Sequence, residues 1–440
     1  MSDDDRLPIV LVILDGLGDR ASDELGGLTP AEAAATPVLD RLSAQGQNGV
    51  LLPFGPGRAT SSERSHWSLF GFGGVPFPGR AALEALGVGL DPPRQTPLFQ
   101  IALRHGEVRD GAVYLSARAK RGRDEEDAER LFAALDGRDR DGYRFEQLPL
   151  RCGERVLAVH GANTADVSDS DSLFDNLHPW MCPQALHDAA DPEAAARIAI
   201  AMKDWLSEGR DILRAHPVNA ARSTRGISVL DTPVSKWASW IDPSMPTFEQ
   251  QVGFAGAAVT DTALYRGLAR VCQMRSVDIA YDAQNPTNDM HARLETASDL
   301  LESASFVHVH VKATDEAGHT KQPAFKRDVI AATDAGLEPL LELCKRAVVV
   351  VTGDHATPSV GQLLHSGDPT PLVAAGPGVR ADSVDTFGER STIAGELGRL
   401  TSDDVLPLSI GFANRPFFLG HRPGPWASLA LPDSPEPMPV

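Results

Sequence analysis

The stretch Pro8-Ile-Val-Leu-Val-Ile-Leu14 is an uninterrupted apolar run built from β-branched residues and leucine. Such a run is typical of a strand that is buried on both faces, as in a parallel sheet. The turn-forming segment Asp15-Gly-Leu-Gly-Asp19 follows at once. The stretch therefore predicts a central parallel strand whose carboxyl end carries an aspartate, Asp15.

Two similar strands are predicted near the other end of the chain. Phe306-Val-His-Val-His-Val311 leads to Asp315, and Ala347-Val-Val-Val-Val351 leads to Asp354. A shorter strand is predicted over 371–375, and helices over about 30–44 and 324–345. Alternation of strands with helices predicts an α/β fold in which helices flank both faces of a parallel sheet.

The middle of the chain has a different pattern. It carries short strand candidates, a charged helix over 125–135 and a long amphipathic helix over 192–215. This pattern predicts a smaller α/β domain inserted into the first. The expected division is a discontinuous metal-binding catalytic domain (1–97 and 260–420), an inserted substrate-binding domain (98–259) and an irregular C-terminal tail (421–440).

The composition argues against a nucleic-acid-binding or membrane protein. Hydrophobic residues make up 42% of the chain, and no apolar run approaches the roughly 20 residues that a membrane helix needs. The net charge of −19 repels nucleic acid and anionic membranes, although local arginines can still bind a phosphate. The acidic N-terminus does not resemble a secretory signal, and the four cysteines form no close pair. We therefore expect a cytoplasmic enzyme with free thiols.

Three of the predicted strands end in a carboxylate. Ligands of open α/β sheets bind beyond the carboxyl ends of the strands, so Asp15, Asp315 and Asp354 should converge on one crevice. One such aspartate alone is ordinarily a turn former or a helix cap. The carboxylates therefore need further support before they indicate a metal site.

Histidines beside these carboxylates supply that support. His319 follows Asp315 by one helical turn, so both side chains can reach one cation. His355 follows Asp354 directly, and His365 lies in the next loop. Mixed Asp/His ligation suits manganese or zinc better than magnesium or calcium, which prefer oxygen ligands.

Ser62 lies in the segment Thr60-Ser-Ser-Glu-Arg-Ser-His66 at the start of a predicted helix. A serine in this position is ordinarily an N-cap. The alternative is that Ser62 is a nucleophile, because ligation to a metal lowers the pKa of its hydroxyl. The N-terminus of the helix would then help to hold a transferred phosphate.

Six stretches carry a resemblance to a known family. They are Leu14-Asp-Gly-Leu-Gly-Asp19, Leu28-Thr-Pro-Ala-Glu-Ala-Ala34, Ser61-Ser-Glu-Arg-Ser-His66, Gly79-Arg-Ala-Ala-Leu-Glu-Ala-Leu-Gly-Val-Gly89, Val311-Lys-Ala-Thr-Asp-Glu-Ala-Gly-His319 and Thr352-Gly-Asp-His-Ala-Thr-Pro358. With these stretches the chain resembles the 2,3-bisphosphoglycerate-independent phosphoglycerate mutases of the shorter, archaeal-type branch, within the alkaline phosphatase superfamily. They lie in family order in the two outer thirds of the chain.

The resemblance implies a two-metal centre and a serine nucleophile. By position, one metal would be held by Asp315, His319 and His365. The second would be held by Asp15, Ser62, Asp354 and His355. In the family the metals are usually manganese, with zinc or cobalt as alternatives here, and the phosphoryl group passes through the serine.

The resemblance is weaker in the predicted inserted domain, where the family binds its substrate. A Phe-Arg stretch of the family is Phe99-Gln100 here, and a His-Arg pair is Glu154-Arg155. Arginines that grip a carboxylate and a phosphate through two hydrogen bonds are not freely replaced. Arg155, Arg225 and Arg266 remain as candidate substrate-binding residues, the last in place of a lysine of the family.

The expected function is a mutase-type phosphoryl transfer on a small phosphorylated hydroxy-acid, with 3-phosphoglycerate as the reference substrate. The main alternative is a phosphohydrolase that uses the same serine and metals on a related phosphate or phosphonate of specialised metabolism. A third possibility is a non-catalytic binding protein, which the intact set of ligands disfavours. The sequence leaves the oligomeric state open.

Overall fold

A computed structural model of the chain describes residues 5–172, 175–415, 433 and 436–439. These residues fall into two compact units. The larger unit is Met1–Phe77 with Pro246–Val440, and the smaller unit is Pro78–Met245. Most of the predicted tail, 421–440, lies outside the described residues. The assignment of catalysis and substrate binding to separate domains stays a prediction.

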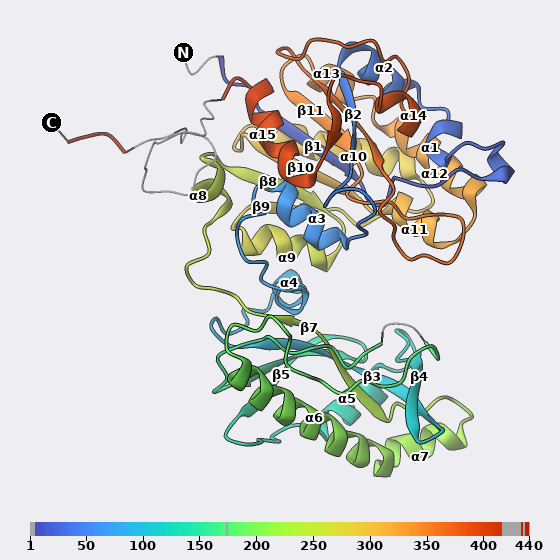
Figure 1. Cartoon of the computed structure of the whole chain (residues 1–440), viewed down its shortest axis with the longest axis vertical. Helices are drawn as coiled ribbons and strands as arrows, with labels where there is room; N and C mark the ends of the chain where they lie inside the picture. The colour runs from blue at the N-terminus through green and yellow to red at the C-terminus, as the bar shows by residue number, and fades with distance from the viewer. Residues whose placement is uncertain (1–4, 173–174, 416–432, 434–435, 440) are drawn as a thin grey trace. The chain divides into compact units, whose positions relative to one another are not determined.

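The larger unit contains an eight-stranded sheet in the order β13-β2-β12-β11-β1-β10-β8-β9. Figure 1 labels β1, β2 and β8 to β11 of this sheet. Its strands are β1 (Ile9–Leu14), β2 (Gln47–Leu51), β8 (Gly256–Thr260), β9 (Arg275–Asp278), β10 (Phe306–Val311), β11 (Val348–Thr352), β12 (Thr370–Ala375) and β13 (Gly398–Leu400). The α/β fold with an alkaline-phosphatase-like, mainly parallel sheet is confirmed. Strand β12 departs from the all-parallel expectation, because it pairs antiparallel with both β11 and β2.

Helices cover this sheet and bury its two faces. They are η2 (Asp23–Leu25), α1 (Pro30–Ala33), α2 (Pro37–Gln45), α3 (Ser62–Leu69), α8 (Phe248–Val252), α9 (Ala263–Val271), α10 (Pro286–Leu300), α11 (Ala313–His319), α12 (Pro323–Gly336), α13 (Leu340–Leu343), α14 (Glu389–Thr392) and α15 (Ser402–Phe412). On one face, the alternate residues Val10, Val12 and Leu14 of β1 pack with apolar residues of α2, α10 and α12. On the other face, His308 of β10 contacts His66 of α3 and Phe70, the residue that follows this helix.

Two helices predicted as single elements are interrupted. The segment predicted as one helix over 30–44 forms α1 and α2, with Thr36 at the break (φ −123°, ψ 57°). Pro37 causes the break, because its ring disfavours helical backbone at the preceding residue. Likewise, the segment 324–345 forms α12 and α13, with Gly336 and Pro339 at the junction.

The smaller unit contains a five-stranded antiparallel sheet, with the path β4-β3-β6-β5 and with β7 also paired to β3. Its elements are α4 (Arg80–Gly87), β3 (Leu98–Arg109), β4 (Ala112–Arg118), α5 (Glu125–Ala133), β5 (Arg144–Arg151), β6 (Glu154–His160), α6 (Pro192–Ala215), α7 (Pro217–Thr224) and β7 (Thr232–Ser239). Helix α4 belongs to this unit because Ala81, Ala82 and Ala85 pack against the sheet. The unit therefore begins before residue 98, where the sequence placed its start.

Within the described residues, no helix has the length and apolar character needed to cross a lipid bilayer.

The start of α2 depends on a distant carboxylate. Asp334 of α12 accepts hydrogen bonds from the backbone N–H groups of Val38 (3.1 Å) and Leu39 (2.9 Å), whereas Thr36 makes no capping bond through its side chain. Asp334 thus replaces the usual N-cap, since the first N–H groups of a helix have no partner within the helix.

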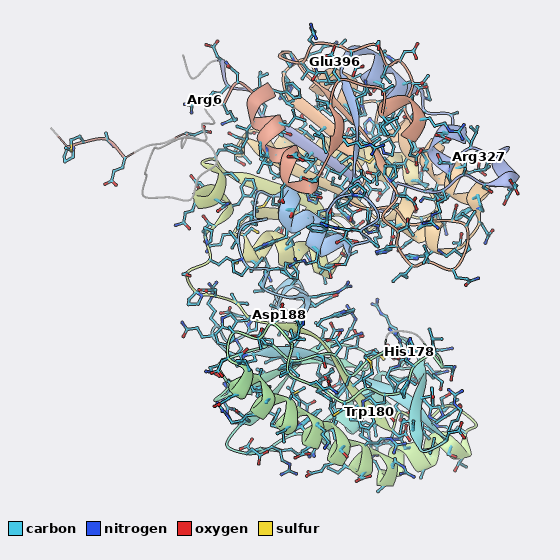
Figure 2. All side chains as sticks on the ribbon, viewed as in Figure 1. Arg6, His178, Trp180, Asp188, Arg327 and Glu396 are labelled. Atoms are coloured by element: carbon cyan, nitrogen blue, oxygen red, sulfur yellow. The ribbon has the colours of Figure 1, made fainter. Side chains whose placement is uncertain are left out.

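We expect Asp334→Ala to lower the free energy of unfolding by about 1–2 kcal/mol, because two buried N–H groups lose their acceptor. Urea denaturation followed by circular dichroism measures this effect. Asp328→Ala is the matched control, since Asp328 lies exposed on the same helix and pairs with Arg327. Arg327 is labelled in Figure 2. Equal stability of the two variants would contradict the capping role of Asp334.

Candidate metal centre

The carboxyl ends of three adjacent strands bring the predicted residues together. Strand β1 lies between β10 and β11, with Leu14 in register with Val311 and Ile13 with Thr352. Each strand is followed directly by a ligand-bearing segment. The register therefore places Asp15, the start of α11 and Asp354 at one edge of the sheet, as the sequence predicted.

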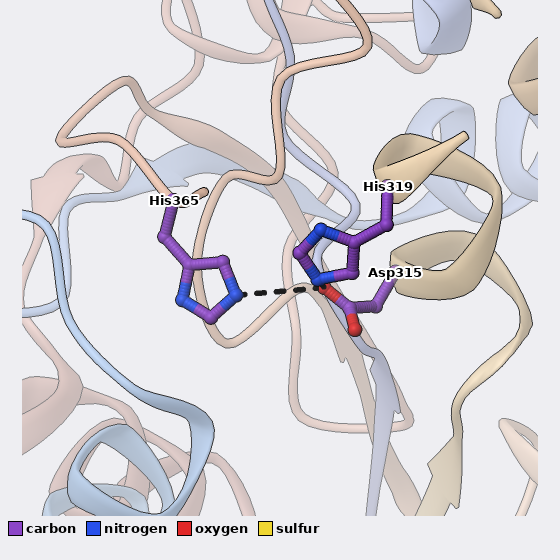
Figure 3. A group of neighbouring side chains, drawn as sticks. All are labelled: Asp315, His319 and His365. Atoms are coloured by element: carbon purple, nitrogen blue, oxygen red, sulfur yellow. Dashed lines mark ion pairs between the residues drawn. The ribbon is translucent and has the colours of Figure 1, made fainter. Parts of the chain in front are cut away.

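Asp315, His319 and His365 form the first group (Figure 3). His319 Nε2 lies 3.2 Å from Asp315 Oδ1, because the two residues are one turn apart on α11. His365 Nε2 approaches the same oxygen from a loop, at 3.7 Å. His365 Nδ1 donates to the backbone carbonyl of Thr60 (2.8 Å), and this bond leaves Nε2 as the nitrogen with a free lone pair.

Asp15, Asp354 and His355 form the second group, and all three are buried. His355 Nε2 lies 3.3 Å from Asp15 Oδ1 and 3.6 Å from Asp354 Oδ2. Ser62 joins them, since its Oγ lies 2.9 Å from His355 Nε2 and 3.5 Å from Asp15 Oδ1. The structure thus brings together all seven residues that the sequence selected as metal ligands.

The two groups are adjacent. The imidazole rings of His355 and His365 stack with their centroids 3.9 Å apart. Thr357 connects the groups as well, because its hydroxyl donates to Asp315 Oδ1 (2.6 Å) and lies 3.3 Å from His355 Nδ1. Displacement of Thr357 would therefore disturb both groups.

Ser62 is the first residue of α3, and the N-cap of this helix is Ser61. Ser61 makes no capping bond through its side chain. The carbonyl of Ser62 accepts a hydrogen bond from His66 Nδ1 (2.8 Å), one turn further along the helix. The hydroxyl of Ser62 is thus not used as a cap, and it points into the second group.

Three residues that hold Asp15 are not among those predicted from the sequence. Tyr265 Oη donates to Asp15 Oδ2 (2.9 Å), His310 Nε2 lies 3.1 Å from it, and Lys312 Nζ lies 2.8 Å from it. Asp15 Oδ2 is thus saturated, while Oδ1 faces Ser62 and His355. Alternation along β10 gave a signal for His310, because His308 and His310 share one face of the strand and the valines share the other.

Lys312 also reaches the first group. Its ammonium lies 2.5 Å from Asp315 Oδ2, so it bridges one carboxylate of each group. Burial by itself raises the pKa of Asp15, but Lys312 and the neighbouring histidines outweigh this effect and hold the pKa well below its ordinary value. The carboxylate of Asp15 is consequently ionised throughout the neutral range.

Two histidines at the site have pKa values that are shifted in opposite directions. Burial lowers the pKa of His365 to about 4, and His355 adds to this shift. For His310, burial acts in the same direction, but Asp261 and Asp15 overcome it and raise the pKa to about 9. His310 is therefore a cation held between two carboxylates, with Asp261 Oδ1 3.1 Å from its Nδ1.

The donor atoms fit divalent metal ions. Each group offers carboxylate and imidazole ligands whose atoms lie within 4.8 Å of one another. Within the described part of the chain, the buried Oδ2 of Asp354 has no hydrogen-bond partner. A buried carboxylate oxygen without a partner is costly unless a cation or a proton satisfies it. Mixed oxygen and nitrogen donors are the ligands that manganese and zinc accept.

The three candidate arginines lie elsewhere and are already paired. In the smaller unit, Arg155 forms an ion pair with Glu129 of α5, and Arg225 pairs with Asp127 of the same helix (2.6 Å). In the larger unit, Arg266 of α9 pairs with Asp278. Each guanidinium thus has a carboxylate partner within its own unit, and the substrate-binding role of these arginines stays a prediction.

The fold and the two groups of candidate ligands are typical of a metalloenzyme with an alkaline-phosphatase-like sheet. Residues 7–410 match the family model of the Metalloenzyme superfamily, whose name implies divalent metal ions. More narrowly, the chain belongs to the 2,3-bisphosphoglycerate-independent phosphoglycerate mutase family.

Individual relatives support this assignment. The mutase of that name from Thermoplasma volcanium is 35% identical over 410 residues, which cover 92% of this chain and 97% of the relative. A solved cofactor-independent phosphoglycerate mutase from Thermoplasma acidophilum is 31% identical, with a TM-score of 0.63 and coverage of 93% and 100%. A solved protein from Pyrococcus horikoshii is 28% identical, with a TM-score of 0.75 and coverage of 94% and 99%.

Gly16 separates the two groups where no larger residue fits. A Cβ at this position would lie 2.5 Å from Thr357 Oγ1 and 2.8 Å from Asp315 Oδ1, and its φ is +64°. We expect Gly16→Ala to weaken Mn²⁺ binding by at least about tenfold in isothermal titration calorimetry, because it displaces the groups that orient the ligands.

Gly26→Ala separates this effect from backbone strain. Gly26 has a similar φ of +68°, but a Cβ there meets nothing within 4 Å. Its substitution should lower the thermal midpoint without changing metal affinity. Equal Mn²⁺ affinities of the two variants would show that the space around Gly16 is not needed for metal binding.

Proposed function

We propose that the chain is a manganese-dependent phosphoglycerate mutase that passes the phosphoryl group through Ser62. The observation that carries this proposal is the position of Ser62 Oγ. It lies at the start of α3 and 2.9 Å from His355 Nε2, beside two buried carboxylates. The family membership and the names of the relatives support the same reaction.

The proposed ligand sets follow the two groups. Asp315, His319 and His365 would hold one metal ion. Asp15, Asp354, His355 and the Ser62 hydroxyl would hold the other. When bound, such ions activate a hydroxyl nucleophile and neutralise the charge that develops on a transferred phosphoryl group.

The residues of the chain have separate roles in this proposal. Ser62 Oγ forms a bond to phosphorus while the bond from phosphorus to the substrate oxygen breaks. The N–H groups at the start of α3 help to hold the phosphoryl group on the serine. The retained hydroxy-acid then takes the group back on its other hydroxyl, so that Ser62 is freed and no water is consumed.

The substrate in this proposal is a small phosphorylated hydroxy-acid, with 3-phosphoglycerate as the first compound to test. The net charge of −19 supports a small-molecule substrate over a nucleic acid. A cytoplasmic location belongs to the same proposal. The substrate-binding role of Arg155 and Arg225 belongs to the same proposal, and either arginine would exchange its carboxylate partner on α5 for the substrate.

This pairing of the arginines gives weight to a second candidate, a phosphohydrolase with the same serine and ligands. The two candidates differ in whether the dephosphorylated product stays bound. Assays of 2-/3-phosphoglycerate interconversion and of inorganic phosphate release on the same enzyme separate them. Interconversion without phosphate release supports the mutase, and rapid release without interconversion supports the hydrolase.

Ser62→Ala should reduce turnover by at least about a thousandfold while leaving the fold intact, because it removes the nucleophile. Ser61→Ala is a closely matched control, since this neighbouring residue is the N-cap but makes no side-chain capping bond. Wild-type enzyme stopped during turnover should carry phosphate at Ser62 in peptide mass spectrometry. Activity above a few per cent in Ser62→Ala would exclude Ser62 as the nucleophile.

The metal assignment predicts about two Mn²⁺ ions per chain in elemental analysis of the dialysed, loaded protein. His319→Ala should retain about one, because the group around Asp15 is unchanged. His291→Ala, at an exposed histidine of α10 that pairs with Glu295, should retain both. A single ion in the wild type, or two in His319→Ala, would contradict the two-metal assignment.

A further inference from the structure

Lys326 of α12 is fully buried in the larger unit, and its ammonium is surrounded by oxygen atoms. It donates to the backbone carbonyls of Gly16 (2.8 Å), Gly18 (3.1 Å) and Thr357 (2.9 Å). A fourth oxygen, Asp19 Oδ2, lies 3.0 Å away. Lysine is rarely buried to this extent unless its charge is paired, so this arrangement calls for an explanation.

The four oxygens belong to the two loops that carry the second group. Gly16, Gly18 and Asp19 follow Asp15 in the loop after β1. Thr357 follows Asp354 and His355 in the loop after β11. Lys326 therefore contacts both loops a few residues after the predicted ligands, although it touches none of the ligands.

The position of Lys326 in the chain adds the first group. Helix α12 begins at Pro323, just after α11 ends at His319, and α11 carries Asp315. Thr357, whose carbonyl binds Lys326, donates its hydroxyl to Asp315 Oδ1. One ammonium thus connects the segments that supply five of the seven predicted ligands.

The loop after β1 supplies Asp15, the loop after β11 supplies Asp354 and His355, and α11 supplies Asp315 and His319. Ser62 and His365 come from other segments.

Asp19 completes the arrangement around the ammonium. Its carboxylate accepts hydrogen bonds from the backbone N–H groups of Ser359 (2.9 Å) and Arg20 (2.7 Å). Asp19 therefore joins the same two loops a second time, next to the ammonium. Burial lowers the pKa of Lys326, and Asp19 opposes this shift.

An uncharged side chain cannot replace this lysine without loss. Methionine has a similar length, but it would remove the ammonium from among three carbonyl oxygens and a carboxylate, and each of them would lose one of its partners. Such groups then repel one another or draw in water, and either response moves the loops apart. Because ligand atoms must be held close to their binding geometry, small loop movements reduce metal affinity.

We propose that Lys326 is a positioning residue for the metal centre, and that its ammonium holds the ligand loops in the geometry that binds metal. This proposal rests on the metal assignment made above. It adds that metal affinity is set in part by a buried cation that contacts neither the metal ions nor the substrate.

The test is titration of metal-free protein with Mn²⁺ alone, by calorimetry and by electron paramagnetic resonance of the free ion. We expect Lys326→Met to weaken Mn²⁺ binding by about ten- to hundredfold. Asp19→Asn is a milder second variant that keeps the shape of the carboxylate, and it should weaken binding in the same direction. It also provides the measurement if Lys326→Met does not fold.

Ile330→Val controls for general destabilisation. Ile330 lies one turn from Lys326 on α12, within the apolar core of the larger unit. This variant should lower the thermal midpoint while leaving Mn²⁺ affinity within about twofold of the wild type. A comparable loss of affinity in Ile330→Val would reduce Lys326 to a structural residue and overturn the proposal.

The outcomes separate this proposal from the proposed function. If the wild type fails to bind two Mn²⁺ ions, the metal assignment fails. If the wild type binds both ions and folded Lys326→Met and Asp19→Asn bind them equally well, the positioning role of Lys326 fails while the metal assignment stands.

Discussion

The site depends on the orientation of Asp15, whose two carboxylate oxygens contact different groups. Oδ2 is occupied by Tyr265, His310 and Lys312, so only Oδ1 faces Ser62 and His355. A carboxylate that could rotate would present either oxygen. Three donors from α9, β10 and the residue before α11 fix its orientation, and with it the position of the predicted nucleophile.

The same buried region must also balance charge. Asp15, Asp315 and Asp354 lie close together with little access to water, and their mutual repulsion is strong in such surroundings. Lys312 offsets this repulsion between the two groups, and His310 offsets it behind Asp15. Lys326 does not contact the predicted ligands. Its ammonium binds three backbone carbonyls and the carboxylate of Asp19, in the loops that carry those ligands. These three cationic side chains thus help to set the geometry of the candidate metal centre independently of the substrate.

Much of the fold and of the predicted site followed from local patterns. The apolar runs ending in Asp15, Asp315 and Asp354 identified three strands whose ends meet, and the four-residue spacing of Asp315 and His319 gave one face of one helix. Local patterns failed where distant residues intervene. The antiparallel direction of β12 and the capping of α2 by Asp334 both depend on contacts between segments that lie far apart in the chain.

The sequence by itself determined the fold class, the types of ligand and the family, because these depend on periodicity, on residue chemistry and on motifs that are short and continuous. Only the tertiary structure decided which oxygen of Asp15 faces Ser62, where the ammonium of Lys326 lies, and that Arg155 and Arg225 pair with carboxylates of α5. These features depend on the packing of side chains from separate segments, and no spacing within one segment encodes such a contact.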